Sequence, residues 1–354
     1  MKAILLRKSG GPGVLAAEEV PDPIPGRGEV LVRLHFTGIN YAEILSRKGL
    51  YGWAVKRPYI LGMEGSGIIE AVGEGVDAAR IGQKVMVGSQ NGAYAEKIAL
   101  PQVRAVSAFE HFSMAENAAF LVNFMTAWVS LFSLARLEAG EKVLVTAAAG
   151  GVGTAAVQLA AKAGGVVYAL AGSQEKIEFL KELGAAGAFN YREENCFERL
   201  KEVSGGVDVV LEMVGGAVYR ESMRLLNPFG RMAVAGFASL DLQKWNPFSW
   251  WKTWRDIPRV SLMSLAHKTA AVMATHLGYL LANPERTLEI FRELRQFVIE
   301  KDIRPAVGRI FPFEQAAQAH AFIESRRSIG KVLLEHRGGG QEAVAGAAAG
   351  GSKQ

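Results

Sequence analysis

The chain has 354 residues, of which 49% are hydrophobic and 21% charged, with 40 glycines and one cysteine, Cys196. This length and apolar content are typical of a soluble α/β enzyme with two domains, each with its own core. The formal net charge is only +5 and Lys and Arg form no block, so nucleic-acid binding is not indicated. One cysteine excludes an intrachain disulfide, and no basic-then-apolar leader is recognised, so we expect a cytoplasmic protein.

The N-terminal third is predicted to form a barrel-like domain of short strands. Four segments combine strand-forming residues with glycine-bounded ends, namely 29–36, 67–73, 84–88 and 92–96. Short strands at turn-bounded intervals are typical of small barrels. An apolar run at 118–134 follows. Because Asn123, Thr126 and Ser130 recur through this run, we interpret it as a buried helix rather than a membrane span.

The most informative stretch is 143–160, where a β-branched run leads through a glycine turn into a helical pattern. A pyrophosphate can rest on the first turn of a helix only where backbone N–H groups face it without an intervening Cβ. Gly150 and Gly151 provide that clearance, with Val152 next to them. Gly153 has a different role, because it lets the helix pack closely on the strand. The turn therefore predicts a site for a dinucleotide.

The elements after this turn strengthen that prediction. In isolation, the same residues could equally form a Gly/Ala-rich bend between a strand and a helix. Further elements follow at the spacing of βαβ units: strands at 166–170, near Phe189 and at 207–213, and a helix at 175–183. We therefore predict a doubly wound Rossmann sheet.

The end of the second strand of this sheet indicates which nicotinamide cofactor binds. An NAD site usually places Asp or Glu there, but the chain has Ala171 and Gly172 instead. Ser173 can donate to a 2′-phosphate and Lys176 can neutralise it, which favours NADPH over NADH. The two residues also fit an ordinary helix N-cap and a surface charge, and the two roles are compatible. Tyr191, after the third strand, either flanks the adenosine phosphate or packs in the core.

A lobe at 240–262 is rich in tryptophan. Four of the six tryptophans lie there among Lys and Arg, namely Trp245, Trp250, Trp251 and Trp254. We favour a hydrophobic lobe over a substrate pocket, or a dimer contact. A basic, tryptophan-rich loop is also the composition of an interfacial membrane anchor, because indole prefers the headgroup layer and Lys and Arg attract anionic lipid.

The chain after residue 282 is predicted to return to the barrel domain, through helices at 288–300 and 313–325 and a closing strand at 331–334. The Rossmann domain is then an insertion. We expect a barrel domain of residues 1–122 plus 283–337 and a Rossmann domain of residues 123–282. The Gly/Ala-rich tail, 338–354, has too few apolar residues to offset its ordering entropy and is expected to be disordered.

Taken together, the motifs resemble the medium-chain dehydrogenase/reductase superfamily over the chain up to Leu334. The resemblance rests on segments in family order: Gly28-Glu29-Val30-Leu31-Val32, Thr37-Gly38-Ile39-Asn40, Gly62-Met63-Glu64-Gly65-Ser66-Gly67, Val72-Gly73-Glu74-Gly75-Val76, Gly82-Gln83-Lys84-Val85 and Gly92-Ala93-Tyr94-Ala95-Glu96. It implies that the barrel is GroES-like and catalytic. Alcohol dehydrogenases of the superfamily bind catalytic zinc through a Cys at the position of Asn40 and a His at that of Met63. Because neither Asn nor Met is a useful zinc ligand, the chain resembles the zinc-free quinone oxidoreductase branch. The tryptophan-rich segment, with His276-Leu277-Gly278-Tyr279-Leu280, most resembles the vesicle amine transport protein group within that branch.

This resemblance implies roles for particular residues. Gly150, Gly151, Val152 and Gly153 form the pyrophosphate turn, Ser173, Lys176 and Tyr191 surround the 2′-phosphate, Asn40 and Thr126 lie beside the nicotinamide end, and Gly236 and Phe237 follow the strand that ends under it. Many relatives have an aromatic residue at the position of Leu45 and Asp at that of Glu43, so one lining residue of the usual quinone pocket is missing. Tyr51 remains, either as a core aromatic or as a phenol that donates to a substrate carbonyl.

The function that follows is NADPH-dependent, zinc-independent hydride transfer to a quinone, with Asn40 or Tyr51 orienting the acceptor. Two alternatives stay open. One is reduction of the double bond of an enone or enal, and the other is an NADPH-binding protein that interacts with membranes or lipids and turns over slowly. The resemblance also implies a homodimer and allows peripheral membrane association.

Overall fold

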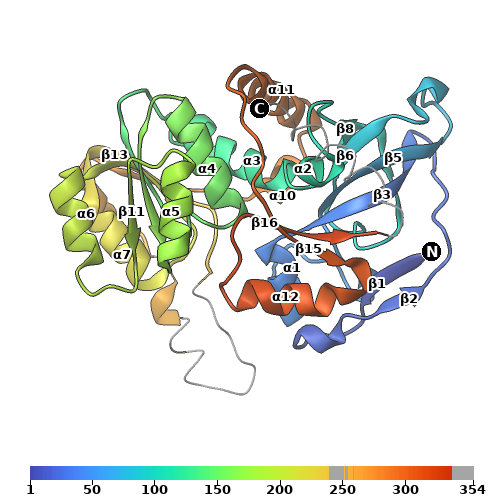
Figure 1. Cartoon of the computed structure of the whole chain (residues 1–354), viewed down its shortest axis with the longest axis horizontal. Helices are drawn as coiled ribbons and strands as arrows, with labels where there is room; N and C mark the ends of the chain where they lie inside the picture. Colours follow the sequence, from blue (N-terminus) through green and yellow to red (C-terminus); the bar gives the residue numbers. More distant parts are fainter. Residues whose placement is uncertain (239–250, 252–253, 258, 337–354) are drawn as a thin grey trace, which may run out of the picture. The chain divides into compact units, whose positions relative to one another are not determined.

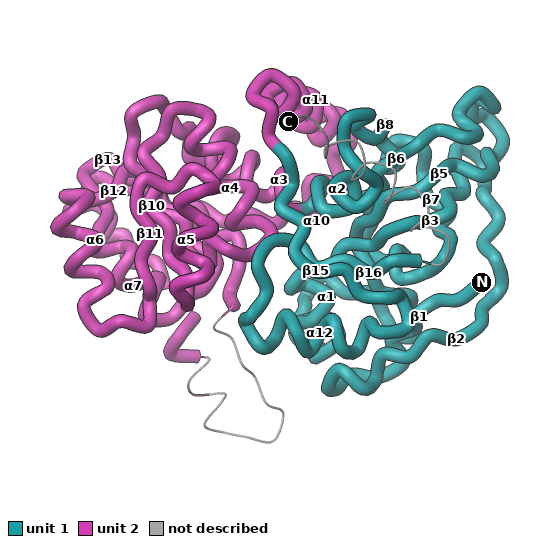
Figure 2. Tube along the Cα trace, viewed as in Figure 1, with its two compact units in different colours: residues 1–122, 304–354 teal, residues 123–303 magenta. Residues whose placement is uncertain are grey.

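The chain forms two compact units, shown in a computed structural model that describes residues 1–238, 251, 254–257 and 259–336 (Figures 1 and 2). Unit 1 contains residues 1–122 and 304–354, and unit 2 contains residues 123–303. The tail at 338–354 and most of the tryptophan-rich lobe, including Trp245 and Trp250, lie outside the described residues.

The boundary at which the chain returns from unit 2 to unit 1 differs from the expected one. Residues 283–303 were expected in the barrel domain, but α11 (Pro284–Glu300) belongs to unit 2. The ring of Phe297 in this helix lies 5.3 Å from that of Trp128 and 6.1 Å from that of Phe132, both also in unit 2. This aromatic packing holds α11 there, and the local sequence pattern of the helix does not reveal it.

Unit 1 is built on a seven-stranded sheet in the order β15-β16-β3-β5-β6-β8, with β7 also pairing with β3. Its strands are β3 (Glu29–Ile39), β5 (Glu64–Val72), β6 (Lys84–Gly88), β7 (Lys97–Pro101), β8 (Ala105–Ser107), β15 (Val307–Pro312) and β16 (Lys331–Glu335). A second sheet contains β1 (Lys2–Leu6), β2 (Ala17–Glu19) and β4 (Tyr59–Ile60). The helices are α1 (Tyr41–Lys48), α2 (Met114–Ala118) and α12 (Ala316–Glu324).

One predicted strand of unit 1 is wrong. Residues 92–96 lie before β7 and make only an isolated bridge, between Ala95 and Ala3. The segment begins at Gly92, whose φ of +104° is left-handed, and the Tyr94 N–H donates to the carbonyl of Leu61 in a loop. A backbone bound in this way has no free edge for a regular strand ladder.

Unit 2 contains a six-stranded parallel sheet in the order β11-β10-β9-β12-β13-β14. Its strands are β9 (Lys142–Val145), β10 (Val166–Ala171), β11 (Gly187–Asn190), β12 (Val207–Glu212), β13 (Leu226–Val234) and β14 (Ala271–Ala274). The helices between and after them are α4 (Gly151–Lys162), α5 (Gln174–Glu182), α6 (Cys196–Ser204), α7 (Gly216–Leu225), α9 (Leu262–Ala266) and α10 (Leu277–Leu280). The predicted architecture, a strand-rich domain interrupted by a doubly wound parallel sheet, is confirmed.

The apolar run at 118–134 is helical and largely buried. It contains α3 (Leu121–Trp128) and a π-helical segment, Val129–Leu134, and both are lined by buried side chains. No helix within the described ranges is long and apolar enough to cross a membrane.

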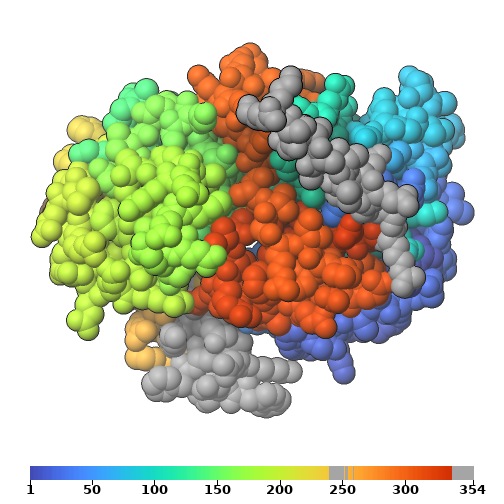
Figure 3. All heavy atoms as spheres, viewed as in Figure 1, coloured from blue at the N-terminus to red at the C-terminus, as the bar shows by residue number. Residues whose placement is uncertain are grey.

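Buried histidines make the stability of unit 1 depend on pH. Helix α12 lies at the surface of this unit (Figure 3), but His320 on its inner side is buried and its Nε2 lies 2.9 Å from the Tyr94 hydroxyl. Burial, with a contribution from Arg47, lowers the pKa of His320 from 6.5 to about 3. Between these values the unfolded chain binds the proton and the folded chain does not, so stability is present above pH 6.5 and is lost as the pH falls toward 3.

We therefore expect His320→Gln to flatten the acid side of the stability profile. Glutamine keeps a polar partner for Tyr94 but does not titrate, so between about pH 7.5 and about pH 5 the wild type should lose about 2 kcal/mol more unfolding free energy than the variant. Urea unfolding at both pH values measures this. The exposed His111→Gln is the control and should behave as the wild type does. Equal losses in the wild type and His320→Gln would contradict the assignment.

Candidate functional site

The glycine turn of unit 2 has the geometry of an anion site. It runs from β9 through Ala147, whose φ is +47°, to Gly150, the N-cap of α4. A Cβ at Gly153 would lie 2.5 Å from the carbonyl oxygen of Ala148, so only glycine allows the turn and the helix to approach this closely. The first-turn N–H groups of a helix lack acceptors within the helix. In α4 these groups belong to residues with a small side chain or none, so an anion can approach them.

Asn123 completes this turn and was missed as a site residue from the sequence. A Cβ at Gly151 would lie 2.6 Å from the Asn123 Nδ2 and 2.8 Å from its Oδ1, so the amide lies over the first residue of α4. Thr126, one helical turn later in α3, is also buried. Asn123 recurs with Thr126 and Ser130 through the apolar run, and this polar spacing is the local signal that could have identified it.

Ser173, Lys176 and Tyr191 come together at the carboxyl ends of β10 and β11. Ser173 is the N-cap of α5, and its Oγ accepts from the Lys176 N–H at 3.5 Å, so its capping role is real. The Tyr191 N–H donates to the carbonyl of Ala171 at 3.0 Å. A Cβ at Gly172 would lie 2.9 Å from the Tyr191 hydroxyl, so the phenol lies directly against the loop between β10 and α5.

Two cations gather at this strand end. Burial lowers the pKa of Lys176, and the charge of Arg192 lowers it further. The Arg192 guanidinium lies 5.9 Å from the centroid of the Tyr191 ring. Arg192 was not predicted, although it follows Tyr191 in sequence. A bound anion at this place would relieve the repulsion between the two cations.

Gly236 and Phe237 follow β13 in the same unit. A Cβ at Gly236 would lie 3.3 Å from the carbonyl oxygen of Met213, the residue after β12, and the Phe237 side chain is 40% exposed. Strands β9, β12 and β13 are parallel neighbours, so their carboxyl ends lie along one edge of the sheet. In an open α/β sheet this edge is where ligands bind.

In unit 1, Asn40 stands at the N-cap of α1. Its backbone N–H donates to Glu43 Oε2 at 2.8 Å, and its side-chain Oδ1 accepts from the Lys331 Nζ at 2.5 Å. Burial raises the pKa of Glu43 to about 7, against the opposing effect of Lys331. Tyr51, the other predicted residue of this unit, is half-buried in the loop after α1, and its ring meets that of Trp53 edge-on at 6.5 Å.

Sequence reasoning misses Glu43 and Lys331 as candidate site residues. It also misses Glu64, whose Oε1 accepts a hydrogen bond from the Lys331 Nζ. The spacing Asn40-x-x-Glu43 is that of a capping box and could have been recognised. Lys331 was interpreted only as part of a closing strand, although a lysine before Val332-Leu333-Leu334 is unusual for a buried strand.

Asn40 and Met63 stand where the resemblance places the zinc ligands of alcohol dehydrogenases, and their side chains are not zinc ligands. The Met63 side chain is buried, and its N–H donates to Glu43 Oε1 at 3.0 Å. Among the residues that the structure describes, no group of three His, Cys, Asp or Glu side chains could hold a metal ion.

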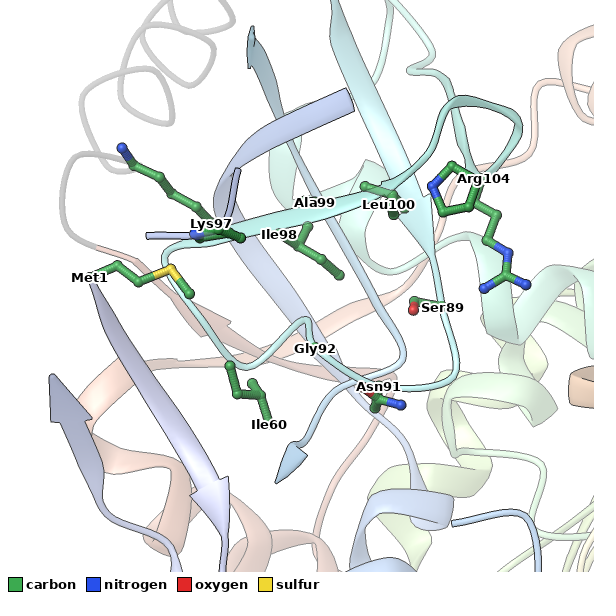
Figure 4. Close-up of a pocket in the computed structure, with 12 residues that line it drawn as sticks. Met1, Ile60, Ser89, Asn91, Gly92, Lys97, Ile98, Ala99, Leu100 and Arg104 are labelled. Atoms are coloured by element: carbon green, nitrogen blue, oxygen red, sulfur yellow. The ribbon is translucent and has the colours of Figure 1, made fainter. Parts of the chain in front are cut away.

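A pocket of about 290 Å³ opens elsewhere in unit 1 (Figure 4). Its lining includes Met1, Ile60, Lys97, Leu100 and Arg104, and none of the predicted site residues. The Lys97 Nζ is already paired with Asp22 at 2.9 Å and with Glu70 at 3.2 Å. The pocket therefore contributes no additional group to the candidate site.

Comparisons with known proteins point in one direction. A family model described as "Alcohol dehydrogenase GroES-like domain" matches residues 26–110, and one described as "Zinc-binding dehydrogenase" matches residues 183–334. The human synaptic vesicle membrane protein VAT-1 homolog is 34% identical over 338 residues, which cover 94% of this chain and 86% of the relative. The rat quinone oxidoreductase is 34% identical over 341 residues, 94% of this chain and 97% of the relative.

Solved structures agree with this result. The Escherichia coli quinone oxidoreductase complexed with NADPH matches with a TM-score of 0.84 and 30% identity, over 95% of this chain and all of that one. The Thermus thermophilus quinone oxidoreductase, also solved in complex with NADPH, matches with a TM-score of 0.78 and 32% identity, over 95% of this chain and 100% of that one.

Proposed function

The chain belongs to the medium-chain dehydrogenase/reductase superfamily, and from this premise we propose that it is an NADPH-dependent, zinc-independent oxidoreductase that transfers a hydride to a quinone. The observation that carries the proposal is the set of groups at the end of β10. Ser173, Lys176 and Tyr191 converge there, with Arg192 beside them, and no acidic side chain stands at the strand tip where an NAD site would have one.

Each group of candidate residues has a task in the proposed reaction. The turn from Gly150 to Gly153 holds the pyrophosphate on the N-terminus of α4, and the group around Lys176 holds the 2′-phosphate. NADPH, when bound, supplies the hydride. The Asn40 amide or the Tyr51 phenol donates to the acceptor oxygen, which gains negative charge as the hydride arrives and then takes a proton from water. Since charge on a reduced quinone is delocalised, the reaction needs positioning more than a strong acid.

Reduction of an enone or enal remains the alternative, because the same donors suit a conjugated carbonyl. NADPH oxidation measured over a panel of quinones and alkenals, after dialysis of the protein against a strong chelator, tests both proposals. We expect turnover to survive the dialysis, because Asn40 and Met63 give zinc no ligands, and kcat/KM to be higher for quinones. Higher kcat/KM for alkenals favours the alternative, and activity that returns only with zinc contradicts the branch assignment.

A second candidate function is peripheral membrane contact, and exposed aromatic residues of unit 2 favour it. The Trp251 and Trp254 side chains are 52% and 60% exposed. Arg255 lies 5.1 Å from the Trp251 ring centroid, and Arg259 lies 3.9 Å from that of Trp254. Exposed indoles beside cations fit the headgroup layer of an anionic membrane. The other two tryptophans of the lobe, Trp245 and Trp250, lie outside the described residues, as do the neighbouring Lys244 and Lys252.

We expect the protein to float with anionic liposomes at low salt. Above about 0.1 M salt, where the Debye length is shorter than about 10 Å, the protein should be released. Trp251→Ser/Trp254→Ser should weaken flotation and leave NADPH affinity unchanged. The control is Phe229→Ser, because Phe229 is equally apolar and 73% exposed in the same unit. The membrane proposal fails if the wild type does not float with liposomes and the tryptophan variant instead loses quinone turnover or dissociates from a dimer. A cytoplasmic homodimer also remains a proposal, which light scattering and cell fractionation test.

A further inference from the structure

A buried ion pair in unit 1 crosses the central strand of the large sheet. Glu64 lies opposite Gly38 in the pairing of β5 with β3, and β16 flanks β3 on its other side. A Cβ at Gly38 would lie 2.8 Å from the Glu64 Cγ and 2.8 Å from the Lys331 Cε. The missing side chain at Gly38 therefore lets Glu64 and Lys331 meet over β3, where they are 1% and 2% exposed.

The second contact of Lys331 fixes the Asn40 amide. The Lys331 Nζ lies 2.5 Å from the Asn40 Oδ1, and an ammonium group can only donate, so the atom it meets must be the amide oxygen. On the other side, the Asn40 Nδ2 lies 3.3 Å from Glu43 Oε1. Glu43 is itself held by the backbone N–H groups of Asn40 and Met63. The amide is thus oriented from both sides.

We propose that Lys331 is a positioning residue that presents Asn40 as a hydrogen-bond donor to the oxygen of a carbonyl-type acceptor. This inference rests on the proposed function. The Asn40 oxygen accepts from Lys331 and one hydrogen of its NH₂ group is directed to Glu43, so the second N–H is the donor that this half-buried amide presents to a ligand. The ammonium behind the amide also polarises it toward donation. The arrangement favours a quinone or enone oxygen, which accepts a hydrogen bond and gains negative charge, over the hydroxyl of an alcohol.

The test removes both charges of the pair, so that neither remains buried alone. Lys331→Met/Glu64→Gln should lower kcat about 10- to 100-fold and leave the NADPH Kd unchanged. The loss is smaller than the roughly 100- to 1000-fold expected when a donor is removed outright, because the Asn40 amide is displaced and not deleted. In an Asn40→Ala background, the same paired change should lower kcat by less than about 2-fold, because residues that act through one group are not additive. The control is Thr37→Val, which breaks the buried bonds of Thr37 to Ala93 and His336 on the same strand without touching Asn40. It should keep its kcat.

A second readout does not depend on turnover. In protein labelled with ¹⁵N-asparagine, the Asn40 side-chain signal is the one lost in Asn40→Ala. The paired variant should shift this signal and speed its exchange with water, while Thr37→Val should not. An unmoved signal, or kcat losses that add fully in the Asn40→Ala background, would overturn the role of Lys331. If the wild type turns over no member of the substrate panel, the proposed function fails, and the amide signal decides on Lys331 by itself.

Discussion

Replacing Gly153 by alanine is expected to disable the dinucleotide turn. The new Cβ would lie 2.5 Å from the Ala148 carbonyl oxygen and 2.6 Å from that of Ala147, so α4 must move away from the turn. Overpacking of this kind costs about 1–3 kcal/mol of stability. Displaced N–H groups no longer match the pyrophosphate, and we expect NADPH affinity to fall by about 100-fold or more, since each 1.4 kcal/mol is about tenfold.

Gly150→Ala is the matched control for this experiment. A Cβ there meets only the Ala147 carbonyl oxygen, at 3.4 Å, and the backbone of Gly150 is extended, so the fold should tolerate it. Urea unfolding and NADPH titration of both variants separate the two roles. Gly150→Ala should have the same unfolding free energy as the wild type. It should bind NADPH more weakly, because we expect its methyl group to face the phosphate. A Gly153→Ala protein as stable as the wild type would show that the contact is not restrictive.

Lys176→Ala is expected to weaken NADPH binding by about 10- to 100-fold and to leave NADH binding nearly unchanged. A charge-assisted hydrogen bond to phosphate contributes about 1.5–3 kcal/mol to binding. NADH has no 2′-phosphate and therefore makes no such bond that the substitution could remove. Fluorescence titration with both cofactors measures the difference. Arg192→Ala should show the same selective loss to a smaller degree, because its side chain is more exposed.

The control for this pair is Lys181→Ala, which removes an exposed lysine from the same helix, α5. It should bind both cofactors as the wild type does. Equal losses of NADH and NADPH affinity in Lys176→Ala would remove this lysine from the phosphate site and would weaken the preference for NADPH.

Local patterns predicted most of the fold, because the elements carry their own signals. The β-branched run before Gly150 and the glycines after it indicate β9, the turn and the start of α4. Helix α11 carries a local signal at its start that the apolar periodicity does not contain. The structure begins it at Pro284 after the Asn283 cap, four residues before the predicted start, although Asn followed by Pro is a recognised helix beginning.

The pairs that complete the candidate site could not be predicted in this way. Asn40 and Lys331 are 291 positions apart, and their contact depends on the register of β16 against β3. That register is set by the whole sheet and not by either segment. In the same way, the position of Asn123 over Gly151 depends on how α3 packs beside the turn. Glycines give a local signal because they act on the backbone at their own position. Side-chain partners on different strands give no local signal, because their contact depends on the pairing of distant segments.

The order of strands in unit 1 has a consequence for synthesis of the protein. Strand β3 leaves the ribosome well before its neighbour β16, because the whole of unit 2 lies between them in the chain. Until then, Glu64 has no ammonium to neutralise it, and the sheet has an open edge where β16 will pair. The cost of burying an unpaired carboxylate is large, so the nascent domain is held short of its final packing until β16 has been made. A chain that stops early thus lacks both the strand and the charge that complete the Asn40 site.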